Sequence, residues 1–264
     1  MAAQGLHVFS FAQLGTTILA AADWGGIRRS EDGGASWTEP NAGLPDQPVF
    51  ESVFAVVAHG SMLFAGTTGS GVYRSEDGGD SWTEVNTGLP TLKTVVSLGT
   101  SGTMLLAGTQ GQGVFRSGDD GDTWTATNIG VESAHVPAIT AVGATLFAAT
   151  LWPTGNGVFR SLDDGDSWTP VNSGLENPDV RCFATDGAAL FTGTNWGVYR
   201  TEDGGDSWTQ VPGSLSLDVV YSLALSGSTL YAATESRGAF RSDDGATWAP
   251  INHGLRASDV RSLA

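Results

Sequence analysis

Basic residues are scarce in this sequence. The 264 residues include one lysine, Lys93, and eleven arginines against 28 acidic residues, so the formal net charge is −16 at pH 7. A surface of that charge repels a nucleic-acid backbone unless one face is locally basic. Because the arginines are spread along the whole sequence, no such face is indicated. We therefore expect no nucleic-acid partner.

Cysteine and long apolar runs are also in short supply. The single cysteine, Cys182, excludes an internal disulfide framework. No apolar run approaches the roughly 18 residues that a membrane-spanning helix requires, so we expect no membrane partner. Residues 16–23 have the apolar composition of a signal-peptide core, but no basic segment precedes them. The residues themselves leave the compartment open.

The common catalytic and cofactor motifs are absent as well. The sequence contains no G-x-S-x-G nucleophile elbow, no glycine-rich phosphate loop and no H-E-x-x-H pair. Its four histidines are too dispersed in sequence to indicate a metal site. We expect no catalytic residue, no cofactor and no bound metal.

One acidic, glycine-rich motif that ends in tryptophan, here called the box, occurs six times in the sequence. It reads SEDGGDSW at 75–82 and recurs as SEDGGASW at 30–37, SGDDGDTW at 117–124, SLDDGDSW at 161–168, TEDGGDSW at 201–208 and SDDGATW at 242–248. The closing tryptophans lie 45, 42, 44, 40 and 40 residues apart. That period is typical of propeller blades, each of which is a four-stranded antiparallel sheet.

Each repeat contains four short apolar segments separated by glycine-rich turns, and the box lies between the third and the fourth. The segments are rich in β-branched and aromatic residues, and no stretch keeps the 3.6-residue period of a helix. We therefore predict an all-β propeller, one domain over 1–264, with six complete four-stranded blades. The blades span roughly residues 6–43, 49–88, 92–130, 135–174, 179–213 and 218–254.

The last residues begin a further repeat. GLRASDVRSLA at 254–264 matches GLENPDVRCFA at 174–184, so we predict a partial extra strand over 258–264. The start of the chain already supplies a first strand for the ring. Two explanations stay open. Either the chain is a piece of a longer propeller, or the extra strand lies at the ring closure or forms an oligomer through its unpaired edge.

The composition of the box favours a structural role. Its aspartate can accept hydrogen bonds from N–H groups of its own turn, its glycine can adopt a positive φ, and its tryptophan can cover the hairpin. Six near-copies are consistent with one structural turn in every blade, whereas a catalytic centre normally occurs once. The residues with this expected role are Asp32, Trp37, Asp77, Trp82, Asp119, Trp124, Asp163, Trp168, Asp203, Trp208, Asp243 and Trp248.

Charged residues in and around the boxes allow two further interpretations. The carboxylates at 119–122 and 163–166 cluster as in a calcium loop, but the EF-hand spacing with its distant glutamate is missing, so we favour acidic turns without metal.

One arginine precedes every box, at the same strand position each time. These six arginines indicate a structural pairing with box carboxylates: Arg29, Arg74, Arg116, Arg160, Arg200 and Arg241.

The pattern Ser/Thr-x-Asp-x-Gly-x-x-Trp resembles the Asp-box, or BNR repeat, of sialidases, xyloglucan-degrading propellers, sortilin-type receptors and photosystem II assembly propellers. Five boxes match it in full, and the sixth is one residue short, which we place between Ser242 and Asp243. The resemblance covers essentially the whole chain and implies a β-propeller. Because these families have unrelated functions, it does not choose among them. It favours an extracellular or periplasmic location.

The connections between second and third strands carry the tryptophans that the boxes do not account for. Of nine tryptophans, six close a box, and the remaining three, Trp24, Trp152 and Trp196, all fall in these connections. In an antiparallel blade this end lies opposite the box, and binding residues concentrate on such loops. The three rings could form a ligand-stacking platform, or each could pack on the neighbouring blade.

Polar residues join the same end of the blades. The candidates for ligand binding are Asp179, Arg181 and Tyr221 at the starts of blades, and Glu235 and Arg237 in the last second-to-third connection. Arg181 occupies an inner-strand position where other blades have apolar or aromatic residues. It could therefore bind an anion in the central channel. The alternative is a solvated arginine paired with an aspartate.

Three functions follow from these features. We favour a non-catalytic binding or scaffold module that recognises a glycan or a protein through the end opposite the boxes. The alternative is a glycoside hydrolase of sialidase or xyloglucanase type built on Tyr221, Arg181 and Arg237 with Glu51 or Glu235, but the Phe/Tyr-Arg-Ile-Pro segment of sialidases is absent. The third is a scaffold similar to the photosystem assembly propellers, which the strong acidity disfavours.

Overall fold

The computed structural model describes residues 7–23, 26–45, 52–91, 94–127, 130–131, 134–151, 156–213, 215–254 and 260–263. They divide into two compact units: residues 1–110 with 114–126, and residues 111–113 with 127–264. Every regular element within the described ranges is a β-strand, as the sequence predicted. These ranges contain no helix that is long and apolar enough to cross a membrane.

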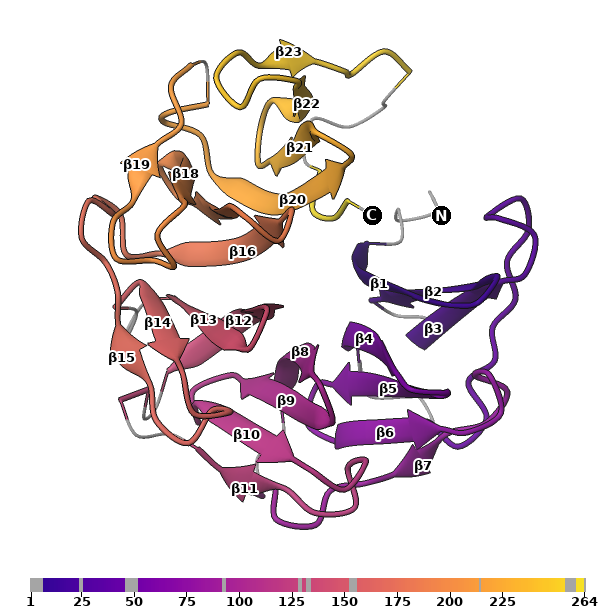
Figure 1. The fold of residues 1–264 in the computed structure, drawn as a ribbon. Coiled ribbons are helices and arrows are strands. Elements are labelled where there is room, and N and C mark those ends of the chain that lie inside the picture. Colours follow the sequence, from indigo (N-terminus) through magenta and orange to yellow (C-terminus); the bar gives the residue numbers. More distant parts are fainter. Residues whose placement is uncertain are drawn as a thin grey trace. The chain divides into compact units, whose positions relative to one another are not determined.

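The first unit contains three sheets whose strands pair antiparallel in chain order (Figure 1). The first sheet is β1 (Val8–Leu14), β2 (Thr17–Ala22) and β3 (Gly26–Ser30). The second is β4 (Val53–His59), β5 (Met62–Thr67), β6 (Gly71–Ser75) and β7 (Thr83–Glu84). The third is β8 (Val95–Ser101), β9 (Met104–Thr109), β10 (Val114–Ser117) and β11 (Thr125–Ala126).

The second unit repeats this plan in three more sheets. The fourth sheet is β12 (His135–Val142), β13 (Thr145–Leu151), β14 (Val158–Ser161) and β15 (Thr169–Pro170). The fifth is β16 (Val180–Thr185), β17 (Leu190–Thr194), β18 (Gly197–Thr201) and β19 (Thr209–Gln210). The sixth is β20 (Val220–Ser226), β21 (Thr229–Thr234), β22 (Gly238–Ser242) and β23 (Ala249–Pro250).

The six sheets are the blades of an all-β propeller, which confirms the predicted fold class. The first blade is less complete than predicted, because its fourth strand is reduced to a single bridge between Arg29 and Thr38. In blade two, the N–H of Val85 donates to the carbonyl of Val72 at 3.0 Å and continues the pairing beyond β7. The equivalent residue of blade one is Pro40, which has no N–H to donate.

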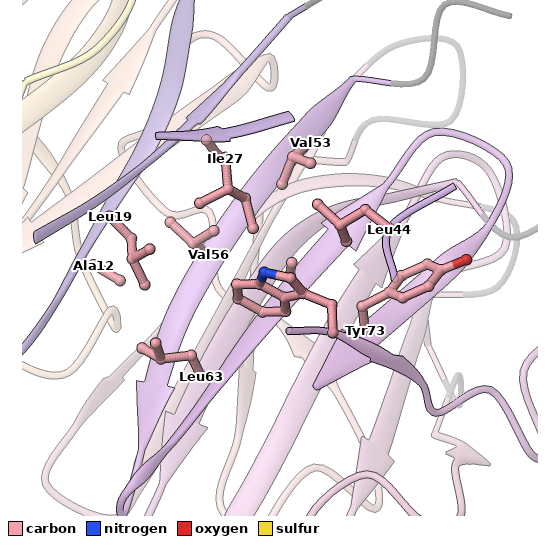
Figure 2. Close-up of a cluster of buried hydrophobic side chains, with 11 residues drawn as sticks. Ala12, Leu19, Ile27, Leu44, Val53, Val56, Leu63 and Tyr73 are labelled. Carbon is pink, nitrogen blue, oxygen red and sulfur yellow. The ribbon is translucent and has the colours of Figure 1, made fainter. Parts of the chain in front are cut away.

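Side chains from neighbouring blades form the cores. Figure 2 shows the cluster between blades one and two, where Leu19 and Ile27 pack with Val56 and Leu63. Leu19, Ile27 and Leu63 are fully buried. A single antiparallel sheet can leave one face to water, but a blade between two others buries both faces. The second strand of each blade is therefore buried almost throughout, as in β5 and β9.

The box closes the hairpin between the third and fourth strands through local hydrogen bonds. In blade two, Oδ1 of Asp77 accepts the N–H of Ser81 at 3.0 Å and the hydroxyl of Ser75 at 2.7 Å, and Oδ2 accepts the hydroxyl of Ser81. The hydroxyl of Ser75 accepts the N–H of Gly79, whose φ is +93°. Bonds from Ser81 and Ser75 hold the pKa of Asp77 well below its usual value. Both carboxylate oxygens are thus occupied within the turn.

The tryptophan of the box covers this hairpin in most blades. The rings of Trp82, Trp124, Trp168 and Trp208 are only 3–4% exposed. The Nε1 of Trp124 donates to the carbonyl of Val85 in the preceding blade at 2.8 Å. Trp37 differs from the expectation, because 41% of it is exposed and its Nε1 bonds to Gly34 within its own turn.

The sixth box requires a correction. The sequence alignment assigned its aspartate to Asp243, but Asp244 makes the bonds of a box aspartate. Its Oδ1 accepts the N–H groups of Ala246 and Thr247 at 2.8 and 2.7 Å, and Oδ2 accepts the hydroxyl of Thr247. Asp243 instead bonds to Arg241 and Thr229 on the surface. The missing residue of this box therefore follows the aspartate.

Three of the arginines before the boxes bond to the box of the next blade, whereas Arg200 and Arg241 bond to acidic residues of their own boxes. Nη1 of Arg74 in blade two donates to the carbonyl of Asp120 at 2.8 Å and to Oδ1 of Asp122 at 2.7 Å, both in the box of blade three. Arg29 makes the same two bonds to blade two, and Arg160 makes them to blade five. We call this bidentate contact the arginine clasp.

Candidate ligand-binding site

In blades five and six a β-bulge lies near the start of the first strand. It takes one side chain out of the regular alternation between the two faces of the sheet. The pairing shifts between Val180 and Cys182 in blade five and between Val220 and Ser222 in blade six. The residues inside these bulges are Arg181 and Tyr221. A bulged residue leaves the ladder and is re-aimed, which is why bulges recur at functional sites.

The two bulged residues contact each other across the blades. The guanidinium carbon of Arg181 lies 5.1 Å from the centre of the Tyr221 ring, within the range of a cation–π contact. The Nε of Arg181 donates to Oδ1 of Asn195 at 2.7 Å, and Nδ2 of Asn195 donates to Oδ2 of Asp179 at 3.0 Å. This chain of bonds fixes the guanidinium plane. The predicted pairing of Arg181 with an aspartate is therefore indirect, through an asparagine that the sequence analysis had not singled out.

The phenol of Tyr221 is tied to the last second-to-third connection. Its hydroxyl donates to Oε1 of Glu235 at 2.8 Å. Burial raises the pKa of Tyr221, and Glu235 raises it further, whereas Arg261 and Arg181 act in the opposite direction. The net shift is upward, so at neutral pH the hydroxyl is protonated and serves as a hydrogen-bond donor.

A second guanidinium reaches the same ring from the C-terminal segment. The guanidinium carbon of Arg261 lies 5.0 Å from the centre of the Tyr221 ring. The N–H of Val260 donates to the carbonyl of Thr234 at 3.2 Å, and that of Leu263 donates to Oγ of Ser222 at 3.2 Å. Arg261 was missed as a site residue, although the match of 254–264 to 174–184 already aligned it with Arg181.

The predicted extra strand over 258–264 is not present in its described part. Residues 260–263 have no strand assignment. Their two hydrogen bonds to blade six attach the segment, but two bonds are too few to form a ladder. The other residues of the prediction lie outside the described part of the chain.

Trp196 follows Asn195 in the chain. It is 48% exposed, its N–H donates to Oγ1 of Thr194 at 2.9 Å, and its carbonyl accepts Nε2 of Gln210 at 2.9 Å. The backbone is thus held while the indole faces solvent. Trp24 and Trp152, the other two predicted platform residues, lie outside the described residues.

Blade five holds this connection differently from the regular blades. In blade two, Oδ1 of Asn86 accepts the N–H of Val72 at 2.8 Å, and its Nδ2 donates to the carbonyl of Ser70 at 2.7 Å. Blade five has Pro212 at the asparagine position, and there Nε2 of Gln210 donates to the carbonyl of Trp196 at 2.9 Å. The N–H of Gly197 donates to the carbonyl of Asp218 at 2.9 Å, as the N–H of Gly113 in blade three donates to the carbonyl of Ala134. The bond from Gly197 ties the connection that carries Trp196 to the chain entering blade six.

Arg237 and His135 are two further polar residues at this end of the blades. Arg237 donates to Oδ2 of Asp218 at 2.6 Å, and its guanidinium carbon lies 5.0 Å from the centre of the Phe240 ring. His135 faces Arg181 from blade four. Burial lowers the pKa of His135 and the charge of Arg181 lowers it further, so the imidazole is neutral at pH 7.

The site thus brings together most of the residues that the sequence singled out. Asp179, Arg181, Tyr221 and Glu235 form one connected cluster, completed by the two residues that were missed, Asn195 and Arg261. Trp196 follows Asn195 in the chain, and Arg237 is paired with Asp218 in the neighbouring connection. Among the described residues, no group of three histidine, cysteine or acidic side chains could hold a metal ion. The arrangement offers hydrogen-bond donors and acceptors around exposed aromatic surface, which suits ligand binding.

Comparisons with solved structures find the same fold in proteins of different kinds. The extracellular domain of BT4673 from B. thetaiotaomicron, described as a one-component system, superposes with a TM-score of 0.77 at 15% identity over 100% of this chain. The GH74 enzyme of Niastella koreensis gives 0.70 at 18% identity over 91% of this chain. YCF48 bound to D1 peptide gives 0.67 at 16% identity over 91% of this chain. At these identities the likeness shows the fold alone.

The lengths of these proteins differ from that of this chain. It covers 36% of the BT4673 domain and 46% of the Niastella koreensis enzyme, but 80% of YCF48. An ancestral GH74 enzyme, AFV00434, is covered to 32%. The chain therefore spans between about a third and a half of the length of the first three structures it matches. No curated protein matches the sequence.

A family model matches the sequence directly. The match extends over residues 4–154, which is more than half of the 264 residues. The model describes a β-propeller domain, in agreement with the six blades in the structure. The chain belongs to the family of DUF6242 β-propeller domains.

Proposed function

We propose that this chain is a non-catalytic binding module whose ligand site lies where blades five and six and residues 260–263 meet, at the end opposite the boxes. The observation that carries the proposal is the contact of Arg181 and Arg261 with the Tyr221 ring. The exposed Trp196 follows Asn195, which holds Arg181, in the chain. Both guanidiniums are oriented in advance, which reduces the entropy that a ligand must overcome on binding.

A glycan is the ligand class we favour. An exposed tryptophan offers a flat apolar surface for one face of a sugar ring, and hydrogen-bonding groups beside it can take the hydroxyls. Asn195, Glu235 and Asp179 provide such groups at this site. The GH74 neighbours support a carbohydrate ligand, and YCF48 bound to a peptide supports a protein ligand as the alternative.

The test is a glycan and peptide array with the purified chain, followed by calorimetry on the strongest ligand. Trp196→Ala and Tyr221→Ala should each weaken binding by at least about tenfold, as expected when an aromatic anchor is removed. Trp37→Ala is the matched control, because Trp37 is also exposed but lies in a box. Absence of binding to every glycan and peptide, or equal losses in the control, would contradict the proposal.

A glycoside hydrolase is the second candidate, because Tyr221 and Glu235 form the kind of tyrosine–carboxylate pair that could act as nucleophile and base. The raised pKa of Tyr221 makes it a poorer nucleophile at neutral pH, which is why we rank this candidate lower. Fluorogenic glycosides provide the test. Turnover that disappears in Tyr221→Phe would establish the hydrolase, and no turnover above a blank would remove it.

A further inference from the structure

We infer that the site takes a sugar acid, with the carboxylate of a uronic acid seated on Arg181 and Arg261. This inference rests on the proposed function and specifies its ligand. A uronic acid is a sugar that carries a carboxylate on its ring, so it combines the two chemistries that the site presents side by side.

The distribution of arginines points to an anionic ligand. Six of the eleven arginines precede the boxes, Arg28 is paired with Glu39 in blade one, and Arg256 lies outside the described residues. The other three, Arg181, Arg237 and Arg261, all lie at the candidate site. In a chain with a net charge of −16, three of the five arginines outside the box positions therefore lie at this end of blades five and six.

The geometry leaves part of the Arg181 fork available to a ligand. Within the described residues, its hydrogen bond to Asn195 is made by Nε. The two terminal nitrogens of a guanidinium can then donate in parallel to the two oxygens of a carboxylate. The stacking on Tyr221 and the bond from Asn195 fix the plane of the fork before the ligand arrives.

The neighbouring indole distinguishes a sugar acid from an acidic peptide. Trp196 follows Asn195 directly in the chain and is 48% exposed, so we assign the sugar ring to its indole. A pyranose stacked on this indole can place its carboxylate on the guanidiniums and its hydroxyls near Asp179 and Glu235. An aspartate or glutamate side chain would use the guanidiniums but has no ring to cover the indole.

The overall negative charge does not exclude such a ligand. At physiological ionic strength the Debye length is about 8 Å, so exposed charges farther away are largely screened. The box carboxylates lie at the opposite end of each blade. The two carboxylates within the cluster, Asp179 and Glu235, accept hydrogen bonds from Asn195 and Tyr221, whereas Arg181 and Arg261 contact the ligand directly. A modest repulsion of the approaching ligand is expected, but the local contacts decide the affinity.

The test compares trigalacturonate with its fully methyl-esterified form in calorimetric titrations of the full chain. Esterification keeps the sugar rings and removes the carboxylate charge. We expect the acid to bind about 10 to 100 times more tightly than the ester, as for loss of a charge-assisted hydrogen bond pair. Arg181→Gln and Arg261→Gln should reduce this preference by at least about tenfold.

Arg200→Gln is the matched control, because it removes the same charge from the box end of blade five, where Arg200 is 46% exposed. It should leave the preference unchanged. Arg261 lies in a segment without strand structure, so Arg261→Gln keeps the test valid if Arg181→Gln fails to fold.

Three results would overturn the inference. If the ester binds as tightly as the acid and Trp196→Ala abolishes both, the binding module stands and the sugar acid is wrong. If an acidic peptide binds and trigalacturonate does not, the ligand is a protein. If the control variant loses the preference as much as Arg181→Gln, the effect is one of net charge and the assigned residues are wrong.

Discussion

Two pairs of neighbouring blades use the same bulge for different chemistry. In blades one and two the bulged residues are Phe9 and Phe54, whose rings stack with centroids 4.8 Å apart. In blades five and six they are Arg181 and Tyr221. The backbone device is common to both pairs, so the bulge itself does not make a site. The side chain at the bulge decides whether the two blades make an aromatic contact or form the polar cluster that we propose as a ligand site.

The box ends of the two regions differ as well. Between blades two and three the arginine clasp is complete, and Arg74 is 18% exposed. In blade five, Arg200 bonds to Glu202 of its own box, because the shortened box of blade six has Ala246 in place of the acceptor aspartate. A cavity of ≈ 580 Å³, lined by Arg200, Gln210 and Ala246 among others, lies beside the missing clasp.

Both differences fall on blades five and six. Blade two has both the arginine clasp and the asparagine hydrogen bonds. Blade five has Pro212 at the asparagine position, and its Arg200 does not form the arginine clasp with blade six. The comparison shows that the box end and the opposite end of blades five and six both depart from the repeat, and the proposed ligand site depends on these departures rather than on the most frequent residues of the repeat.

The largest effect we expect comes from the box tryptophans. Trp124→Ala should lower the free energy of unfolding by about 3–5 kcal/mol, because it removes a ring that is 3% exposed and hydrogen-bonded to Val85. Trp248→Ala should cost only about 1–2 kcal/mol, since that ring is half-buried and its Nε1 has no partner among the described residues. Urea unfolding of both variants provides the measurement. Equal losses would remove the distinction between the regular and the adapted blades.

The second-largest effect we expect is a loss of stability of the boxes at acidic pH. The pKa of Asp163 is lowered to about 2 from its ordinary 3.8, chiefly by hydrogen bonds from Ser167. A carboxyl whose pKa is lower in the folded state stabilises the fold fully above pH 4, and this contribution is lost as the pH falls from 4 to 2. The urea midpoint should drop over that range and drop less steeply in Asp163→Asn. Parallel curves for the variant and the parent protein would contradict this role.

The sixth box offers a finer comparison within one turn. Asp244→Ala should lower the melting temperature, because the N–H groups of Ala246 and Thr247 lose their acceptor. Asp243→Ala should change it less, since Asp243 contacts only surface partners, Arg241 and Thr229. Thermal melts followed by circular dichroism measure both. The reverse order would restore the original assignment of Asp243.

The smallest change in the free energy of unfolding is expected for the arginine clasp. Arg74→Ala should cost up to about 1 kcal/mol, as is usual for a partly exposed bidentate pair, and Arg200→Ala should cost close to nothing. The two variants remove the same side chain from equivalent strand positions, so each serves as the control for the other. If Arg200→Ala destabilises as much as Arg74→Ala, the contact across blades contributes nothing of its own.

The repeat made most of the fold predictable from sequence. Glycine turns, alternating apolar strands and the position of the box depend on local chemistry, so the six blades and the bonds of Asp77 followed from residue types alone. The single bridge of blade one was missed, although Pro40 shows in the sequence why the pairing stops there.

The site was harder to predict, for two physical reasons. Arg181, Tyr221 and Glu235 were found because they depart from the repeat, but their contacts depend on bulges that no single residue reveals. Asn195 was missed because an asparagine in a turn has an ordinary local explanation. The sixth box was misaligned because Asp243 and Asp244 are identical residues, and only their hydrogen bonds distinguish them.

A crystal structure of the chain with its tightest ligand from the array tests the central claim most directly. We predict the ligand on the indole of Trp196, with an acceptor atom within hydrogen-bonding distance of Arg181. A ligand bound among the box turns, or in the cavity beside Arg200, would contradict the claim that blades five and six bind at the end opposite the boxes.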